Sequence, residues 1–123
     1  MSMSEPAGGL FAKPYEEIRA LKARSRMDTG AILVDVREPA EWAAGHVEGA
    51  RHIPLAQLGQ RHGELPVGRP VITVCRSGAR SARGATLLAE QDADASNLDG
   101  GMRAWAAAGL PVVTEGGRPG AVI

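Results

Sequence analysis

The sequence lacks a net charge, a second cysteine and any long apolar run, and each absence excludes a class of protein. The 14 basic and 14 acidic side chains cancel, so no positive excess is available to neutralise nucleic-acid phosphates or anionic lipid. One cysteine cannot form an internal disulfide framework or a cysteine-rich metal site. Residues 1–13 lack the basic start and apolar core of a secretory signal, and no later run reaches membrane-spanning length. We expect a soluble, cytoplasmic protein that binds neither nucleic acid nor membranes.

Length and composition predict one folded domain. The 123 residues allow a single modest core, and the 44% hydrophobic and 23% charged content is that of an ordinary globular chain. Residues 1–13 carry Ser, Pro, Gly and Ala without periodicity, and residues 116–123 include three Gly and one Pro. We therefore predict a domain over residues 14–115 between a flexible N-terminal and a flexible C-terminal tail.

Two β-favouring runs and several helical patterns indicate the fold class. Residues 31–36 and 70–75 are continuous β-favouring runs without alternation, which is typical of strands buried on both faces. In residues 15–21, Tyr15, Ile18 and Leu21 share one face of a predicted amphipathic helix. Further helical stretches are expected at residues 38–44, 55–62, 81–90 and 101–108, the last ending at a C-cap glycine, Gly109. Alternating strands and helices predict an α/β fold, with a small parallel β-sheet flanked by helices on both faces.

The segment after the second predicted strand carries the chemistry. Ligands gather at the carboxyl ends of parallel strands, where this chain places Cys75 and then Arg76, Ser77, Gly78, Ala79 and Arg80. Gly78 can adopt backbone angles closed to other residues, and residues 76–81 contain no proline, so every N–H can point at one anion. The start of the next helix and two arginines add positive potential. A sulfur inside this ring would be held as a thiolate, the attacking form.

These residues leave two interpretations of Cys75 open. It is either a reactive thiol in an anion-binding loop or a small apolar side chain at the end of a buried strand, a common place for an inert cysteine. The three histidines are scattered, and no spacing resembles a metal set.

Three stretches resemble the single-domain rhodaneses, a family of sulfurtransferases. They are residues 33–54 (LVDVREPAEWAAGHVEGARHIP), the Cys75 loop and residues 98–105 (LDGGMRAW), in the family's order and at similar separations. The resemblance implies that Cys75 takes a sulfane sulfur as a persulfide from a donor such as thiosulfate or a low-molecular-weight persulfide. It further implies delivery to cyanide or a thiol, with no cofactor beyond the covalent persulfide. A sulfur-relay protein is an open alternative partner.

The other residues of these stretches receive supporting roles. Asp35 and Arg37 end a buried strand, where we expect them to pair and brace the neighbouring loops. His46 is expected to satisfy nearby backbone groups rather than to react. Arg80 closes the loop and is expected to brace it through hydrogen bonds to carbonyl groups, whereas Arg76 is expected to face the entrance.

Two other activities remain as alternatives. Phosphatases of the Cdc25 type and arsenate reductases resemble rhodaneses in fold, but the phosphatase loop has one more residue between Cys and Arg. Here the loop from Cys75 to Arg80 spans six residues, which favours a single sulfur atom over a phosphoryl group. A non-catalytic rhodanese-like binding module is the third alternative, although such modules often lack the cysteine that this chain keeps.

Overall fold

A five-stranded parallel β-sheet forms the centre of the molecule. The computed structural model describes residues 13–123; the N-terminal tail expected over residues 1–13 therefore lies outside the described residues except for its last residue. The strand order is β1-β5-β4-β2-β3, and every pairing is parallel. The strands are β1 (Glu16–Ile18), β2 (Ile32–Asp35), β3 (Arg51–His52), β4 (Val71–Val74) and β5 (Ala95–Leu98). The predicted fold class is confirmed.

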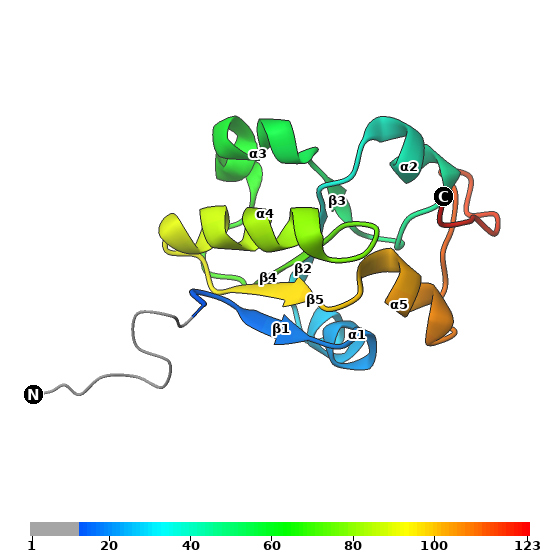
Figure 1. Cartoon of the computed structure of the whole chain (residues 1–123), viewed down its shortest axis with the longest axis horizontal. Helices are drawn as coiled ribbons and strands as arrows, with labels where there is room; N and C mark the ends of the chain where they lie inside the picture. The colour runs from blue at the N-terminus through cyan, green and yellow to red at the C-terminus, as the bar shows by residue number, and fades with distance from the viewer. Residues whose placement is uncertain (1–12) are drawn as a thin grey trace, which may run out of the picture.

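Helices cover both faces of the sheet, with α3 and α4 on one side and α1 on the other (Figure 1). The helices are α1 (Ala20–Asp28), α2 (Pro39–Ala44), α3 (Leu55–Arg61), α4 (Ala79–Glu90) and α5 (Gly101–Ala107), with a 3-10 turn, η2, at His62–Glu64. One apolar cluster joins α1 and α5 to the sheet, and it includes Leu33, Ile72 and Trp105. The second lies under α3 and α4, and it includes Val34 and Cys75. The central strands β2, β4 and β5 are buried at every position. They are largely apolar, and their few polar side chains, Asp35, Thr73, Ser96 and Asn97, are buried with them.

The helix predicted over residues 15–21 is wrong. Glu16–Ile18 form the edge strand β1, which pairs with β5, and α1 begins only at Ala20. Ile18 is buried, whereas Leu21, its expected neighbour on the helical face, is 67% exposed. Backbone pairing with a strand about eighty residues away determines the structure of this segment. The local periodicity that suggested a helix contains no information about that pairing.

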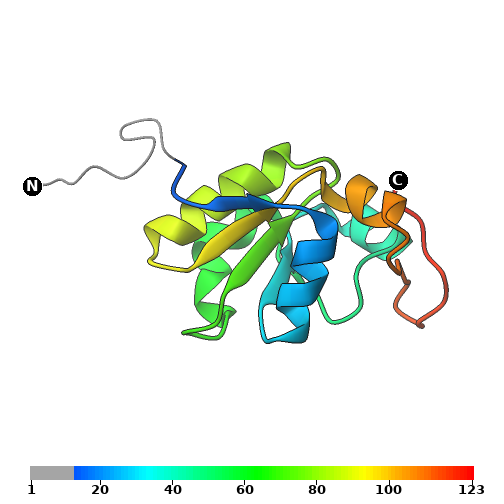
Figure 2. The same cartoon turned by 90° about the horizontal axis from the view of Figure 1, so that it is seen from below.

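The C-terminal segment lies against the domain, near α2 (Figures 1 and 2). The sequence predicted a flexible tail over residues 116–123, but the N–H of Gly120 donates to the carbonyl of Val112 at 2.8 Å. The N–H of Ala121 donates to the carbonyl of Ala44 at 2.9 Å. These bonds hold the segment beside the end of α2. Within residues 13–123, none of the helices has the length and apolar character that a bilayer crossing requires.

Candidate active site

The Cys75 loop connects β4 to α4 at the carboxyl edge of the sheet. β4 lies between β5 and β2, so the loop leaves the middle of the sheet, where the sequence predicted a ligand site. Gly78 precedes the first residue of α4 with a φ of +114°, a left-handed conformation that favours glycine. This turn directs the N–H of Gly78 at the sulfur of Cys75, with a nitrogen-to-sulfur distance of 3.1 Å.

Cys75 is buried, with 1% of its surface exposed, and its sulfur is surrounded by hydrogen-bond donors. The hydroxyl of Ser81, in the first turn of α4, lies 3.3 Å from the sulfur. Burial raises the pKa of the Cys75 thiol, but the Ser81 hydroxyl and the backbone N–H groups of Ser81, Gly78 and Ser77 together outweigh it, and the pKa is lowered. A lowered pKa favours the thiolate, which is the attacking form of cysteine.

The donors differ in part from those expected. The sequence predicted that every backbone N–H of residues 76–81 could point at the anion, whereas the N–H with a hydrogen bond to the sulfur in the structure is that of Gly78. The hydroxyl of Ser81 was not predicted at all. The sequence could have suggested this contact, because a serine in the first turn of the helix after such a loop places its hydroxyl close to the backbone N–H groups of the loop.

The N-terminus of α5 supports the loop from behind. The N–H of Met102 donates to the carbonyl of Cys75 at 2.8 Å, and the N–H of Arg103 donates to the carbonyl of Arg76 at 3.1 Å. Gly101 makes this approach possible: its φ is +62°, and a Cβ there would collide with the carbonyl of Cys75 and lie 2.6 Å from that of Arg76. The Gly-Gly pair noted in the sequence therefore has a packing role at the site.

The sequence suggested that Arg80 braces the loop through hydrogen bonds to carbonyl groups. The structure shows a different partner for Arg80. Its two terminal nitrogens donate to the two carboxylate oxygens of Glu41 in α2, each at 2.8 Å. Hydrogen bonding from Arg80 lowers the pKa of Glu41 to about 2, against the opposing effect of burial, and the N–H of Glu38 adds to the lowering. A carboxylate from a distant helix accepts both bonds because the guanidinium matches its geometry. Arg80 therefore ties α4 to α2, and its charge is offset.

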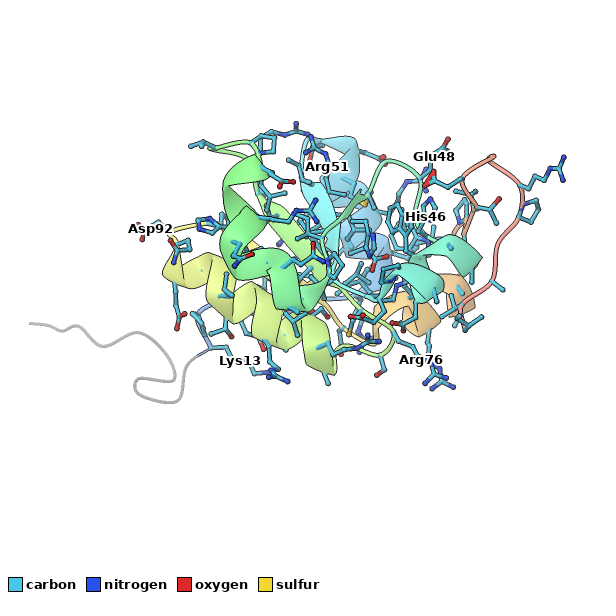
Figure 3. All side chains as sticks on the ribbon, turned by 90° about the horizontal axis from the view of Figure 1, so that it is seen from above. Lys13, His46, Glu48, Arg51, Arg76 and Asp92 are labelled. Carbon is cyan, nitrogen blue, oxygen red and sulfur yellow. The ribbon has the colours of Figure 1, made fainter. Side chains whose placement is uncertain are left out.

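Arg76 is exposed and points away from the body of the molecule (Figure 3). It forms no ion pair with any residue in the described part of the chain. Its positive charge is therefore available to an approaching anion. Ser77 and Ala79, close to it in the sequence, are also exposed.

Asp35 and Arg37 form a fully buried ion pair at the end of β2. The Arg37 Nη2 nitrogen lies 2.7 Å from the Asp35 Oδ2 oxygen and also donates to the carbonyl of Gly45 at 2.7 Å. The Nη1 nitrogen of Arg37 is buried without a hydrogen-bond partner among residues 13–123. The pair holds the end of β2 to the residue that follows α2. Such a charge pair is tolerated in the core because each partner compensates the other.

His46 and His52 both stack on the Trp42 ring. The distance between ring centroids is 3.6 Å for His46 and 4.8 Å for His52, and the rings of each pair are nearly parallel. His46 Nδ1 lies 2.7 Å from the carbonyl of Trp42, and His52 Nε2 lies 2.7 Å from the carbonyl of Arg37. Each imidazole is thus paired with a backbone group. Within residues 13–123, no hydrogen bond joins either ring to the Cys75 loop.

Known proteins match the chain over most of its length. The sequence profile of the rhodanese-like domain matches residues 19–108. The Bacillus subtilis protein YqhL is 45% identical over 61% of this chain and 60% of its own length. A protein named sulfurtransferase from Allochromatium vinosum is 42% identical over 70% of this chain and 81% of its own. The Pseudomonas aeruginosa protein named thiosulfate sulfurtransferase GlpE is 32% identical over 74% and 84%.

A solved structure has the same architecture. The rhodanese-related protein from Thermoplasma volcanium superimposes with a TM-score of 0.77 at 28% identity, covering 82% of this chain and all of its own. The match to YqhL spans about 60% of the length of that protein. The profile covers well over half of the chain and includes the Cys75 loop. The chain belongs to the family of rhodanese-like domain proteins.

Proposed function

We propose that this protein is a sulfurtransferase that carries a sulfane sulfur as a persulfide on Cys75. The observation that supports the proposal most directly is the buried Cys75 sulfur, which faces the N–H of Gly78 and the hydroxyl of Ser81 and has a lowered pKa. An inert cysteine would pack among apolar groups, which raise the pKa of a thiol. The names of the sulfurtransferase relatives agree with this proposal.

The reaction divides into two displacements at sulfur. In the first, the Cys75 thiolate attacks the sulfane sulfur of the donor. A bond forms between the two sulfurs, the sulfur–sulfur bond of the donor breaks, and the leaving group departs with the electron pair, as sulfite when thiosulfate is the donor. In the second, the acceptor attacks the outer sulfur, the persulfide bond breaks, and the Cys75 thiolate returns. Cyanide as the acceptor gives thiocyanate. Neither step needs a cofactor, a metal or an external oxidant.

The loop supplies fixed dipoles for both steps. The N–H groups that surround the thiolate are oriented before the reaction begins, and they also stabilise the anionic outer sulfur of the persulfide. Losing one such donor typically costs about 3 kcal/mol at comparable sites. The side chains of Asp35, Arg37 and His46 take no part in the chemistry and support the neighbouring segments.

The charges at the entrance favour an anionic donor. Because Glu41 offsets the charge of Arg80, the free cation at the loop is Arg76. Thiosulfate fits this arrangement, and the relative GlpE is named for that substrate. Low-molecular-weight persulfides present the same sulfane sulfur to the loop, and cyanide or a thiol completes the cycle. A sulfur-relay protein is a further partner of the same chemistry.

Intact-mass measurement after incubation with each donor tests the proposal. We expect the protein to gain the mass of one sulfur atom from thiosulfate, and to lose it when cyanide is added. Cys75→Ser is the control. The substitution is nearly isosteric, so this variant should unfold at the same urea concentration as the wild-type protein. It should neither gain sulfur nor produce thiocyanate, because its oxygen cannot form the persulfide. Thiocyanate production by Cys75→Ser near the wild-type rate would overturn the proposal, as would no sulfur uptake from any donor class.

A further inference from the structure

A buried polar side chain behind the loop has no place in the chemistry described above. Asn97, in β5, is 1% exposed. Its Nδ2 nitrogen donates to the carbonyl of Gly78 at 3.1 Å and to the carboxylate of Glu17 at 3.2 Å. Its Oδ1 oxygen lies 3.2 Å from the hydroxyl of Thr73. The two acceptors on the nitrogen side, Gly78 and Glu17, determine the orientation of the amide.

The hydroxyl of Ser81 has one hydrogen and two acceptors within reach. Its oxygen lies 3.3 Å from the sulfur of Cys75 and equally 3.3 Å from the carbonyl oxygen of Gly78. A hydroxyl donates only one hydrogen bond, so the two acceptors compete for it. When the hydrogen points to Gly78, the thiolate loses the donor that lowers its pKa most.

The carbonyl of Gly78 already has two other donors. The N–H of Ala82 reaches it at 3.1 Å, as the first bond of α4, and Asn97 reaches it at 3.1 Å. A carbonyl oxygen has two lone pairs, and these two donors occupy both. The hydrogen of Ser81 is therefore left for the sulfur. If Asn97 were absent, one lone pair on Gly78 would be free to take it.

We propose that Asn97 is a positioning residue for the thiolate, which it stabilises without touching it. By occupying the carbonyl of Gly78, Asn97 directs the hydroxyl of Ser81 to the sulfur of Cys75. The inference deepens the proposed function, because it explains how the loop keeps the nucleophile ionised. It concerns the thiol itself, and it is tested without any sulfur donor.

The pH dependence of alkylation by iodoacetamide measures the pKa of the thiol. Cys75 is the sole cysteine in the sequence, so the reaction reports on this site alone. We expect Ser81→Ala to raise the pKa, because a donor to the thiolate is removed. We expect Asn97→Ala to produce a smaller rise, because the hydrogen of Ser81 can then also point to the carbonyl of Gly78.

A double-mutant cycle separates this mechanism from a general loosening of the site. In the Ser81→Ala background no hydroxyl hydrogen remains to be redirected, so adding Asn97→Ala should raise the pKa no further. Ser96→Ala is the matched control. Ser96 is the preceding residue of β5, is equally buried, and accepts a hydrogen bond from Arg26 instead of contacting the loop. We expect it to leave the thiol pKa at the wild-type value.

Two results would contradict the proposal. One is a wild-type thiol pKa in Asn97→Ala, and the other is an Asn97→Ala effect that persists in the absence of the Ser81 hydroxyl. Far-UV circular dichroism establishes that each variant is folded, and Asn97→Ser replaces Asn97→Ala if the latter is not, since the shorter hydroxyl cannot reach Gly78. A protein that takes up no sulfur but shows the predicted cycle would refute the proposed function and leave this inference standing.

Discussion

Gly101 is the residue through which the packing behind the Cys75 loop is best tested. Its φ of +62° and its closeness to the backbone of Cys75 and Arg76 leave no room for a Cβ. Gly101→Ala therefore has two costs. One is the left-handed conformation of a residue with a Cβ, about 1–2 kcal/mol. The other is displacement of α5, which breaks the bonds from Met102 and Arg103 to the loop.

The two costs add to a substantial loss of stability. Each backbone hydrogen bond contributes about 1 kcal/mol, so the two bonds from α5 to the loop contribute about 2 kcal/mol. With the conformational cost, Gly101→Ala should lower the free energy of unfolding by about 3–4 kcal/mol. Domains of this size are stable by about 5–15 kcal/mol, so the variant should still fold.

Gly109→Ala is the matched control, at the other end of the same helix. Gly109 has a φ of +79°, in the same left-handed region, but a Cβ there would meet no atom within 4 Å. Gly109→Ala should therefore lower the free energy of unfolding by the conformational cost alone, about 1–2 kcal/mol. The difference between the two variants isolates the contact between α5 and the loop.

Urea unfolding and alkylation provide the two measurements. Trp105 is fully buried in α5, so its fluorescence reports unfolding of both variants. Gly101→Ala should also slow alkylation of Cys75 below neutral pH, because a displaced carbonyl moves the sulfur from its donors. Equal losses of stability in Gly101→Ala and Gly109→Ala, or a wild-type alkylation rate in Gly101→Ala, would refute this account of the site.

Three further expectations concern charge and loop size. Arg76→Ala should raise KM for thiosulfate and spare kcat, with little effect on a neutral persulfide donor. Arg80→Ala should lower kcat for both donors and slow alkylation, because it removes the ion pair that holds α4, the helix that carries Ser81, to α2. Steady-state kinetics in which the two variants behave alike would contradict this division of roles. The Glu41 pKa is about 2 instead of 4.5, so the stability from its ion pair is complete above pH 4.5 and lost as the pH falls toward 2. Near pH 6, Glu41→Gln should therefore have a free energy of unfolding only about 1 kcal/mol lower than that of the wild-type protein, because solvent screens the ion pair. In urea titrations, this difference in the free energy of unfolding should disappear as the pH falls toward 2. The wild-type protein should not hydrolyse aryl phosphates, because its loop is one residue short for a phosphoryl group, and phosphatase activity that disappears in Cys75→Ser would overturn this expectation.

Strands β2 and β4 and the position of the Cys75 loop were predictable because their signals are local. Two continuous β-favouring runs indicated β2 and β4, whereas β5 was not predicted, and helical spacing located α2 to α5 within two residues at each end. A cysteine followed by a turn with one glycine and no proline, between a strand and a helix, suggested an anion-binding loop but left open whether Cys75 is a reactive thiol or a packing residue. Each of these features depends on residues within one turn or one strand, whose conformations follow from their own side chains.

Tertiary structure alone decided which distant residues serve that loop. The partner of Arg80 is Glu41, 39 positions earlier, and the carbonyl of Gly78 is met by Asn97, 19 positions later. β1 is a strand because β5 supplies its hydrogen bonds, although its own sequence suggested a helix. These pairings arise only when the sheet brings the carboxyl ends of separate strands to one edge, and no local pattern records which side chains will meet there.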